Sequence, residues 1–241
     1  MILCLDCGNT RLKWGVCAQG TWLASGILQH ADLAQLGRQL PAGCKPETVI
    51  GCNVAGVACA ERIEKALSLP VRWIEARERQ CDVLNGYDDP ASLGADRWAA
   101  LIGARSEHRG AALVVLAGTA TTIDVLGADG RHRGGLILPG LTMMANALAQ
   151  GTAGLPLARG EYRQMPRNTD DAIASGAVQA TLGAIERMFA ALPQHEDPRC
   201  LLAGGAADVL QAHLGVPLRR SDSLVLAGLA CIAAESPPHP A

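Results

Sequence analysis

An internal repeat is the feature that most constrains the fold of this 241-residue sequence. Residues 1–28 read as three strands joined by a turn around Gly8 and a second turn that also contains glycine. Residues 112–138 repeat this order, with Gly118 in the place of Gly8. Both copies continue into alternating helices and strands, and a pattern that occurs twice indicates a duplicated domain.

The repeat predicts an α/β protein with mixed sheets and two halves, one over residues 1–110 and the other over residues 111–241. Duplication places the turns at Gly8 and Gly118 opposite each other across an interdomain cleft, and clefts of this kind commonly bind ligands. Two glycine turns related by a repeat make phosphate the leading ligand.

Residue patterns predict the individual elements. Strands are expected at 2–6, 11–17, 21–28, 47–53, 70–75 and 199–203 and in three segments of 112–138, and helices at 31–39, 58–67, 93–107, 169–192, 205–213 and 223–235. Ser92 is the expected N-cap of the helix at 93–107. The tail over residues 235–241 is expected to be disordered.

Composition excludes several classes of function. The formal net charge is -2 and aromatic residues make up 3% of the chain, so the basic excess and the stacking residues of a nucleic-acid-binding protein are missing. The longest apolar stretch, residues 111–117, is far too short to span a bilayer. The N-terminus lacks the basic region and long apolar core of a signal peptide. We therefore expect a cytoplasmic protein with no nucleic-acid or membrane partner.

Nine cysteines are scattered along the chain and include a C-x-x-C pair at Cys4 and Cys7. No second pair or histidine cluster follows at a zinc spacing, and alternation along a strand puts Cys4 and Cys7 on opposite faces. Most of the cysteines are therefore expected to be small buried hydrophobic residues in a reducing compartment.

The first turn combines the groups that phosphate and Mg²⁺ require. Asp6 ends the first strand, where its carboxylate can hold Mg²⁺ directly or through water. Gly8, Asn9 and Thr10 supply backbone N–H groups and polar side chains suited to phosphate oxygens, and Lys13 adds a positive charge. A plain hairpin turn, with Lys13 as a solvated strand residue, explains the same residues, since Asx–Gly hairpins are common.

Other glycine-containing turns carry weaker signals. Gly118 and Thr119 in the second copy can bind the same phosphates from the other half. The segments 134–140 and 203–210 each end a strand with glycine before a helix, and a tight strand-to-helix connection is enough to explain both.

Tyr87, Asp96 and Arg97 lie in a loop that leads into the helix expected at 93–107. As a functional residue, Asp96 accepts the proton of an attacking hydroxyl while Arg97 binds a substrate carboxylate. Positioning matters more than basicity in this role, because phosphoryl transfer has a loose transition state. As a structural residue, Asp96 only stabilises the helix start through the helix dipole, by about 0.3–1 kcal/mol.

Five segments occur in the order and spacing of one known family. They are DCGNTRLKWG, GYDDPASLGADRW, AGTATTID, GGLILPG and NTDDAIASG, and together they extend over nearly the whole chain. On these segments the sequence resembles the type III pantothenate kinases, which belong to the actin-like, sugar-kinase and acetate-kinase superfamily. The resemblance implies a duplicated ribonuclease-H-like fold. It also implies ATP-dependent phosphorylation of pantothenate to 4′-phosphopantothenate, the first step of coenzyme A biosynthesis.

The resemblance implies roles for individual residues as well. Asp96 is the implied catalytic proton acceptor, and Asp6 is the implied residue next to Mg²⁺. The implied ATP-binding residues are Asp6, Cys7, Gly8, Asn9, Thr10, Arg11, Leu12, Lys13 and Thr119. The implied substrate-binding residues are Tyr87, Gly94, Ala95, Asp96, Arg97 and Thr169.

Members of the family are homodimers, and the residue that matches Thr169 reaches the substrate pocket of the neighbouring chain. A simpler role for Asn168 or Thr169, as the cap of the helix at 169–192, is compatible with this one. One position departs from the family pattern. Leu116 stands where the family commonly has an aspartate that binds K⁺ or NH₄⁺, and leucine supplies no oxygen ligand. We therefore expect activity to depend little on K⁺, or backbone carbonyls to bind it weakly.

Two other functions compete with the kinase. A non-catalytic nucleotide-binding or regulatory protein of the same fold is suggested only by Leu116, and the presence of Asp6, Asp96 and Arg97 argues against it. A kinase for a sugar or another small alcohol is the third possibility. Sugar sites collect several Asp, Asn and Glu side chains, whereas this loop offers Tyr87 and Arg97, which suit an acid with an apolar middle.

Overall fold

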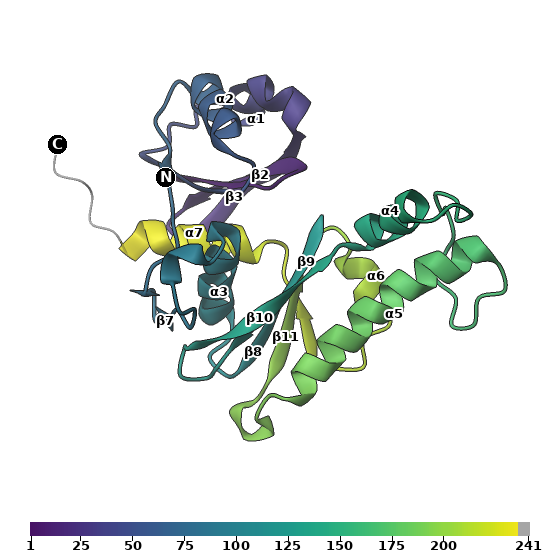
Figure 1. The fold of residues 1–241 in the computed structure, drawn as a ribbon. Helices are drawn as coiled ribbons and strands as arrows, with labels where there is room; N and C mark the ends of the chain where they lie inside the picture. Colours follow the sequence, from purple (N-terminus) through teal and green to yellow (C-terminus); the bar gives the residue numbers. More distant parts are fainter. Residues whose placement is uncertain (236–241) are drawn as a thin grey trace. The chain divides into compact units, whose positions relative to one another are not determined.

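The computed structural model describes residues 1–235, which form two compact units (Figure 1). Neither unit is a continuous segment of the chain. The first consists of Met1–Arg109, Gly130–His132 and residues 223–235, and the second consists of Gly110–Asp129 and Arg133–Asp222. Residues 236–241 of the tail that was predicted to be disordered lie outside the described residues.

A five-stranded mixed sheet forms the centre of the first unit, in the order β3-β2-β1-β4-β5. Its strands are β1 (Ile2–Cys7), β2 (Arg11–Ala18), β3 (Thr21–Gln29), β4 (Thr48–Asn53) and β5 (Arg72–Trp73). Strand β1 pairs antiparallel with β2 and parallel with β4. Helices cover both faces of this sheet (Figure 1), and β1 is accordingly buried along nearly its whole length.

The helices of the first unit come from both ends of the chain. They are η1 (His30–Gln35), α1 (Leu36–Gln39), α2 (Val57–Leu67), η2 (Pro90–Ser92), α3 (Ala95–Glu107) and α7 (Leu224–Glu235), and a short hairpin of β6 (Arg79–Gln80) and β7 (Val83–Leu84) accompanies them. Helices α3 and α7 approach closely at two glycines. A Cβ at Gly103 would collide with the carbonyl oxygen of Leu224, and a Cβ at Gly228 would collide with that of Ala99.

The second unit repeats the sheet of the first. Its strand order is β10-β9-β8-β11-β12, with β8 antiparallel to β9 and parallel to β11. The strands are β8 (Ala112–Ala117), β9 (Ala120–Leu126), β10 (His132–Pro139), β11 (Arg199–Ala203) and β12 (Leu218–Arg220), and the helices are α4 (Leu141–Gly151), α5 (Thr169–Ala190), η3 (Gln194–Glu196) and α6 (Ala207–Gln211). The identical order of the two sheets confirms the predicted duplicated α/β fold.

Two local predictions differ from the structure. Ser92 is not the N-cap of α3, because Pro90 starts a separate 3-10 turn in which the Ser92 hydroxyl donates to the Asp89 carbonyl. Gly94 takes the cap position instead. The close packing of α7 on α3 also places the C-terminal helix in the first unit, although the repeat had assigned it to the half over residues 111–241.

Within residues 1–235, no helix combines the length and the apolar character that a membrane crossing needs.

Candidate active site

The turn after β1 is the tight hairpin that the sequence predicts. The Gly8 N–H donates to the Arg11 carbonyl at 3.2 Å and closes the turn. Asn9 and Thr10 at its tip are exposed. The turn therefore presents polar groups to solvent at the end of a buried strand.

Asp6 is the buried charged group of this region. It is 8% exposed, and its Oδ2 lies 3.9 Å from the Lys13 ammonium, which the β1–β2 register places opposite it. The Cys52 thiol donates to its Oδ1 at 3.6 Å. Burial raises the pKa of the Asp6 carboxyl above its usual value; the Lys13 charge offsets part of this shift and the Asp96 carboxylate adds to it. Asp6 and Asp96 therefore lie close enough to interact.

Asp96 occupies the first turn of α3 and is half-buried. Its Oδ1 accepts the N–H of Arg97 at 2.8 Å, which holds the carboxylate against the helix start. A Cβ at Gly94 would lie 2.8 Å from the same oxygen, so glycine leaves room for this arrangement. The free N–H groups of a helix N-terminus favour the ionised carboxylate.

Arg97 points into a network with Tyr87 rather than into solvent. It is 4% exposed, and its Nη1 donates to the Tyr87 hydroxyl oxygen at 2.7 Å. The Tyr87 ring stacks on His132 with ring centres 5.5 Å apart, and its backbone N–H donates to the Asn85 side chain at 3.0 Å. The predicted substrate residues from Tyr87 to Arg97 are thus brought together in the first unit.

The second turn is also closed by the N–H of its glycine, but over one residue fewer than the first. The Gly118 N–H donates to the Ala120 carbonyl at 3.0 Å, and both Gly118 and Thr119 are exposed. Leu116, two residues earlier on β8, is half-buried and pairs with Thr122 of β9. This turn belongs to the second unit, so its predicted position opposite Gly8 stays a prediction.

Thr169 is the first residue of α5 and also belongs to the second unit. The side chain of Asn168 accepts the N–H of Asp171 at 2.8 Å, which confirms the predicted helix cap. Thr169 lines an open groove of about 900 Å³ whose other walls include Leu148 and Ile173.

The sequence interpretation missed the residues that contact the Gly8 turn and Tyr87. His30 Nε2 lies 2.9 Å from the Gly8 carbonyl oxygen, and no local motif marks His30 as a partner of that turn. His132 and Asn85, which position Tyr87, were missed as well. Asn85 stands two residues before Tyr87, and that spacing is the one signal that could have identified it.

The charges of the site suit a divalent cation and a polyanion together. Asp6 and Asp96 bring two carboxylates to this place, and the Lys13 ammonium lies 3.9 Å from Asp6. Carboxylate oxygens are the ligands that a small divalent cation such as Mg²⁺ prefers. Lys13 and the polar residues Asn9 and Thr10, exposed at the tip of the turn, favour an anion at the same place.

Comparisons with known proteins agree with this geometry. The family model described as type III pantothenate kinase matches residues 2–191. A type III pantothenate kinase of Aromatoleum aromaticum is 54% identical over 239 residues, covering 98% of each chain, and one of Dechloromonas aromatica is 49% identical over 241 residues, covering 98% of this chain and all of the relative. The ethanolamine utilization protein EutJ of Carboxydothermus hydrogenoformans shares the fold, with a TM-score of 0.58 and 13% identity over 95% of this chain and 89% of its own. This likeness agrees with the duplicated, actin-like architecture expected from the sequence.

The buried carboxylate yields a stability prediction. Because the pKa of Asp6 is raised in the folded chain, the ionised form destabilises folding as the pH rises above the unfolded value of 3.8. An amide resembles the neutral carboxyl, so Asp6→Asn raises the melting temperature at about pH 8, and the gain shrinks as the pH falls toward about 5. Thermal unfolding in chelator-treated buffer measures the change, with the exposed Asp88→Asn as the matched control. An Asp6→Asn protein that is less stable than the wild type at the higher pH would contradict the burial cost.

Proposed function

Because this chain belongs to the type III pantothenate kinase family, we propose that Asp6 and Asp96 bring the phosphates of ATP and the hydroxyl of pantothenate together. The activity of the family is the ATP-dependent phosphorylation of pantothenate, the first step of coenzyme A biosynthesis. The observation that carries the proposed roles is the pair of interacting carboxylates, one at the end of β1 and one at the start of α3.

The turn after β1 is the proposed phosphate site. Gly8 offers its backbone without a side chain in the way, and Lys13 brings a positive charge to the same end of the sheet. The proposed ATP contacts are Asp6, Cys7, Gly8, Asn9, Thr10, Arg11, Leu12 and Lys13 in the first unit and Thr119 in the second. Cys7 and Leu12 are buried, so they contribute backbone groups only.

Asp6 is the proposed residue next to Mg²⁺. Its carboxylate is buried at the end of β1 and interacts with that of Asp96, and carboxylate oxygens are the ligands that a divalent cation of this kind prefers. Bound there, Mg²⁺ would neutralise charge on the phosphates during transfer. Lys13 holds the carboxylate from the neighbouring strand and keeps it at the end of β1.

Asp96 is the proposed proton acceptor. As the pantothenate hydroxyl oxygen bonds to the terminal phosphorus of ATP, the bond from that phosphorus to the bridging oxygen breaks and ADP leaves. The hydroxyl proton passes to the Asp96 carboxylate. The Arg97 N–H donates to Oδ1 of this carboxylate at 2.8 Å, which holds the group at the start of α3 where the hydroxyl would approach.

Arg97 and Tyr87 are the proposed recognition residues for pantothenate, together with Gly94, Ala95 and Thr169. Pantothenate carries a carboxylate, and the buried, positively charged guanidinium of Arg97 beside the Tyr87 hydroxyl suits such an anion. The Tyr87 ring, stacked on His132, supplies a rigid apolar wall beside it. This combination favours an acid over a sugar as the acceptor.

Replacing the proposed proton acceptor tests the mechanism. Asp96→Asn should lower kcat by about 10²–10⁴-fold, the usual contribution of a positioned base, while ATP still binds. Steady-state kinetics with pantothenate and equilibrium ATP binding measure the two effects. The exposed Asp88→Asn, in the same loop, is the matched control. Unchanged turnover of Asp96→Asn would remove this residue from the chemistry.

We propose that the side chain of Leu116 does not bind a monovalent cation, because it has no oxygen atom. The wild-type rate should then be the same in potassium, ammonium and sodium buffers. Leu116→Asp supplies the carboxylate that the family commonly has and should make the rate respond to K⁺. Strict dependence of the wild type on K⁺ would contradict this proposal.

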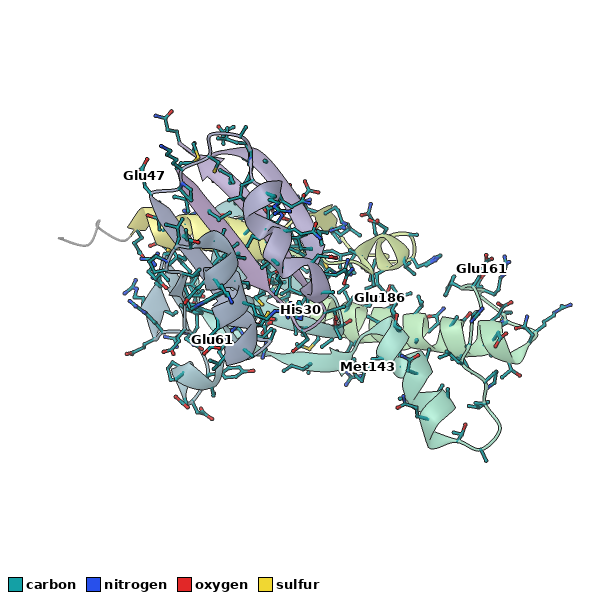
Figure 2. All side chains as sticks on the ribbon, turned by 90° about the horizontal axis from the view of Figure 1, so that it is seen from above. His30, Glu47, Glu61, Met143, Glu161 and Glu186 are labelled. Atoms are coloured by element: carbon teal, nitrogen blue, oxygen red, sulfur yellow. The ribbon has the colours of Figure 1, made fainter. Side chains whose placement is uncertain are left out.

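The homodimer of the family is proposed for this chain as well. Large apolar side chains are exposed around α4 of the second unit, where Figure 2 marks Met143, and along the segment that follows. Ile137 is 65%, Leu157 59% and Met165 82% exposed. An apolar area of this kind next to the groove at Thr169 suits a protein partner, and a second copy would complete the substrate pocket.

A charge placed in this apolar area tests the dimer. The wild type should elute with twice the chain mass of 25.1 kDa, and Leu148→Asp should shift it toward the monomer because the buried charge would lack a partner. Size-exclusion chromatography with light scattering measures the mass. Val209→Asp, at an apolar residue of α6 with similar exposure, is the control. A monomeric wild type would contradict the proposal.

We also propose a cytoplasmic location. Each of the nine cysteines, all within residues 1–235, carries a free thiol, and thiols persist in the reducing cytosol where ATP is available.

A further inference from the structure

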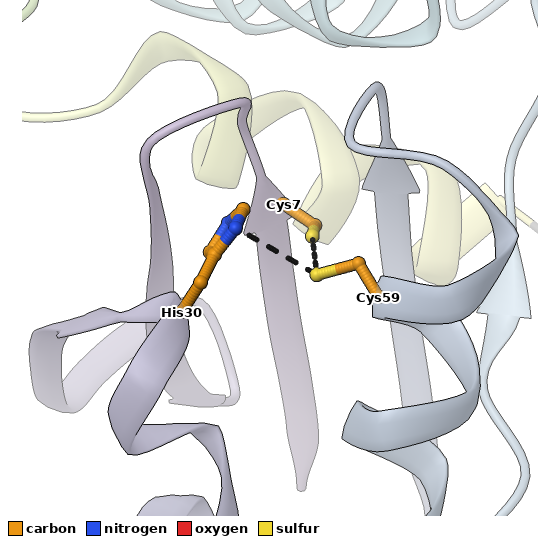
Figure 3. Close-up of side chains that lie close together, drawn as sticks. All are labelled: Cys7, His30 and Cys59. Atoms are coloured by element: carbon orange, nitrogen blue, oxygen red, sulfur yellow. Dashed lines mark hydrogen bonds between the residues drawn. The ribbon is translucent and has the colours of Figure 1, made fainter.

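Cys7, Cys59 and His30 converge beside the turn at Gly8, although they are far apart in the sequence (Figure 3). Cys7 ends β1, Cys59 lies in the first turn of α2, and His30 opens η1. The two sulfur atoms are 3.1 Å apart, and Cys59 Sγ lies 4.0 Å from His30 Nε2. All three potential ligand atoms lie within 4.8 Å of one another.

These separations are close to those of a tetrahedral metal site. With Zn–S bonds of about 2.3 Å and Zn–N bonds of about 2.0–2.1 Å, tetrahedral ligand atoms lie roughly 3.5–3.8 Å apart. The two sulfur atoms, 3.1 Å apart, would need to separate by roughly half an ångström, and Cys59 Sγ and His30 Nε2, 4.0 Å apart, would need to come slightly closer. Both cysteines are buried, while the half-buried His30 leaves one side open for entry.

We propose that Cys7 Sγ, Cys59 Sγ and His30 Nε2 form a binding site for a thiophilic divalent cation, and that the bound cation is Zn²⁺. On binding, both thiol protons pass to solvent, so two thiolates balance the charge of the dication and the buried cluster becomes neutral. Water takes the fourth position. The hard ion Mg²⁺ prefers oxygen ligands and does not compete here.

The site is distinct from the place proposed for Mg²⁺. Successive side chains of a strand point to opposite faces, so Cys7 and Asp6 project from opposite sides of β1. Cys7 packs in the apolar cluster that contains Cys59 and Ile63 of α2, whereas Asp6 interacts with Lys13, Cys52 and Asp96.

Metal binding would act on the phosphate turn through His30. The same Nε2 atom lies 2.9 Å from the Gly8 carbonyl oxygen, and it cannot bind a metal and donate to that oxygen together. Occupancy of the site therefore releases the Gly8 carbonyl and weakens ATP binding. This consequence rests on the proposed role of the turn, whereas the metal site itself does not.

Cobalt binding tests the site without reference to catalysis. The reduced, metal-free full-length chain is titrated with Co²⁺, whose visible spectrum shows tetrahedral geometry and thiolate ligation. We expect one equivalent to give a tetrahedral, thiolate-ligated spectrum that one equivalent of Zn²⁺ then abolishes. Cys59→Ser should weaken the affinity by about 10-fold or more, since it removes a direct ligand, and His30→Gln should also weaken it. Cys44→Ser, at a half-buried cysteine outside the cluster, should bind like the wild type.

Several outcomes would overturn the proposal. They are a wild-type spectrum without thiolate-to-cobalt bands, equal affinity in wild type and Cys59→Ser, or a loss in Cys44→Ser as large as in Cys59→Ser. A Cys7–Cys59 disulfide found by mass spectrometry, together with no metal uptake after reduction, would assign the cluster to thiol oxidation instead. If serine prevents folding at this buried position, Cys59→Ala replaces it, because alanine keeps a small apolar side chain.

Kinetics then test the coupling to the turn. Zn²⁺ should raise the KM for ATP in the wild type and Cys44→Ser but not in Cys59→Ser, which also controls for displacement of Mg²⁺. An equal effect of Zn²⁺ in Cys59→Ser would refute the coupling. A protein without kinase activity would refute the proposed function, and the cobalt spectrum would still decide the metal site.

Discussion

The burial of the Asp6 carboxylate at the end of β1 is the constraint on which the site depends. Burying a carboxylate costs free energy unless a partner compensates its charge. The antiparallel register places Lys13 opposite Asp6 through backbone pairing. Asp96 approaches from the start of α3 and adds a second negative charge, which raises the pKa of Asp6 instead of lowering it. The fold thus places two carboxylates next to the exposed tip of a turn. A divalent cation would lower the cost of burying these carboxylates, and it would also attract a phosphate to the same place.

Turns, strand pairs and helix caps formed by residues close together in the chain were largely predictable from the sequence. The repeat of strand, glycine turn and strand predicted both sheets, since antiparallel neighbours joined by a tight turn leave little choice of partner. The sequence predicted Asn168 or Thr169 as the cap of the helix at 169–192, and Asn168 is the cap in the structure. The cap expected at Ser92 was wrong, because Pro90 starts a 3-10 turn in which the Ser92 hydroxyl donates to the Asp89 carbonyl oxygen. The roles of the individual site residues remain proposals.

Contacts between distant segments could not be read from the sequence. The Asp6–Asp96 interaction, the His30 contact with Gly8 and the Cys7–Cys59 pair join residues that no local spacing relates. The return of α7 to the first unit is similar, because the close crossing at Gly103 and Gly228 becomes visible only when both helices are placed. That crossing has a consequence for the site. Helix α3 carries Asp96 at its N-terminus, so the position of this carboxylate depends on a helix formed by the last described residues of the chain.

The two faces of β1 offer two kinds of ligand within one residue of each other. Asp6 presents carboxylate oxygen on one face, and Cys7 presents sulfur on the other beside a second sulfur and an imidazole. Hard and soft cations therefore separate by ligand chemistry although both sites adjoin the same turn. Gly8 directly follows Cys7, and its carbonyl oxygen lies 2.9 Å from Nε2 of the histidine of the soft site. A change on the sulfur face would consequently reach the phosphate turn through the hydrogen bond between His30 and Gly8.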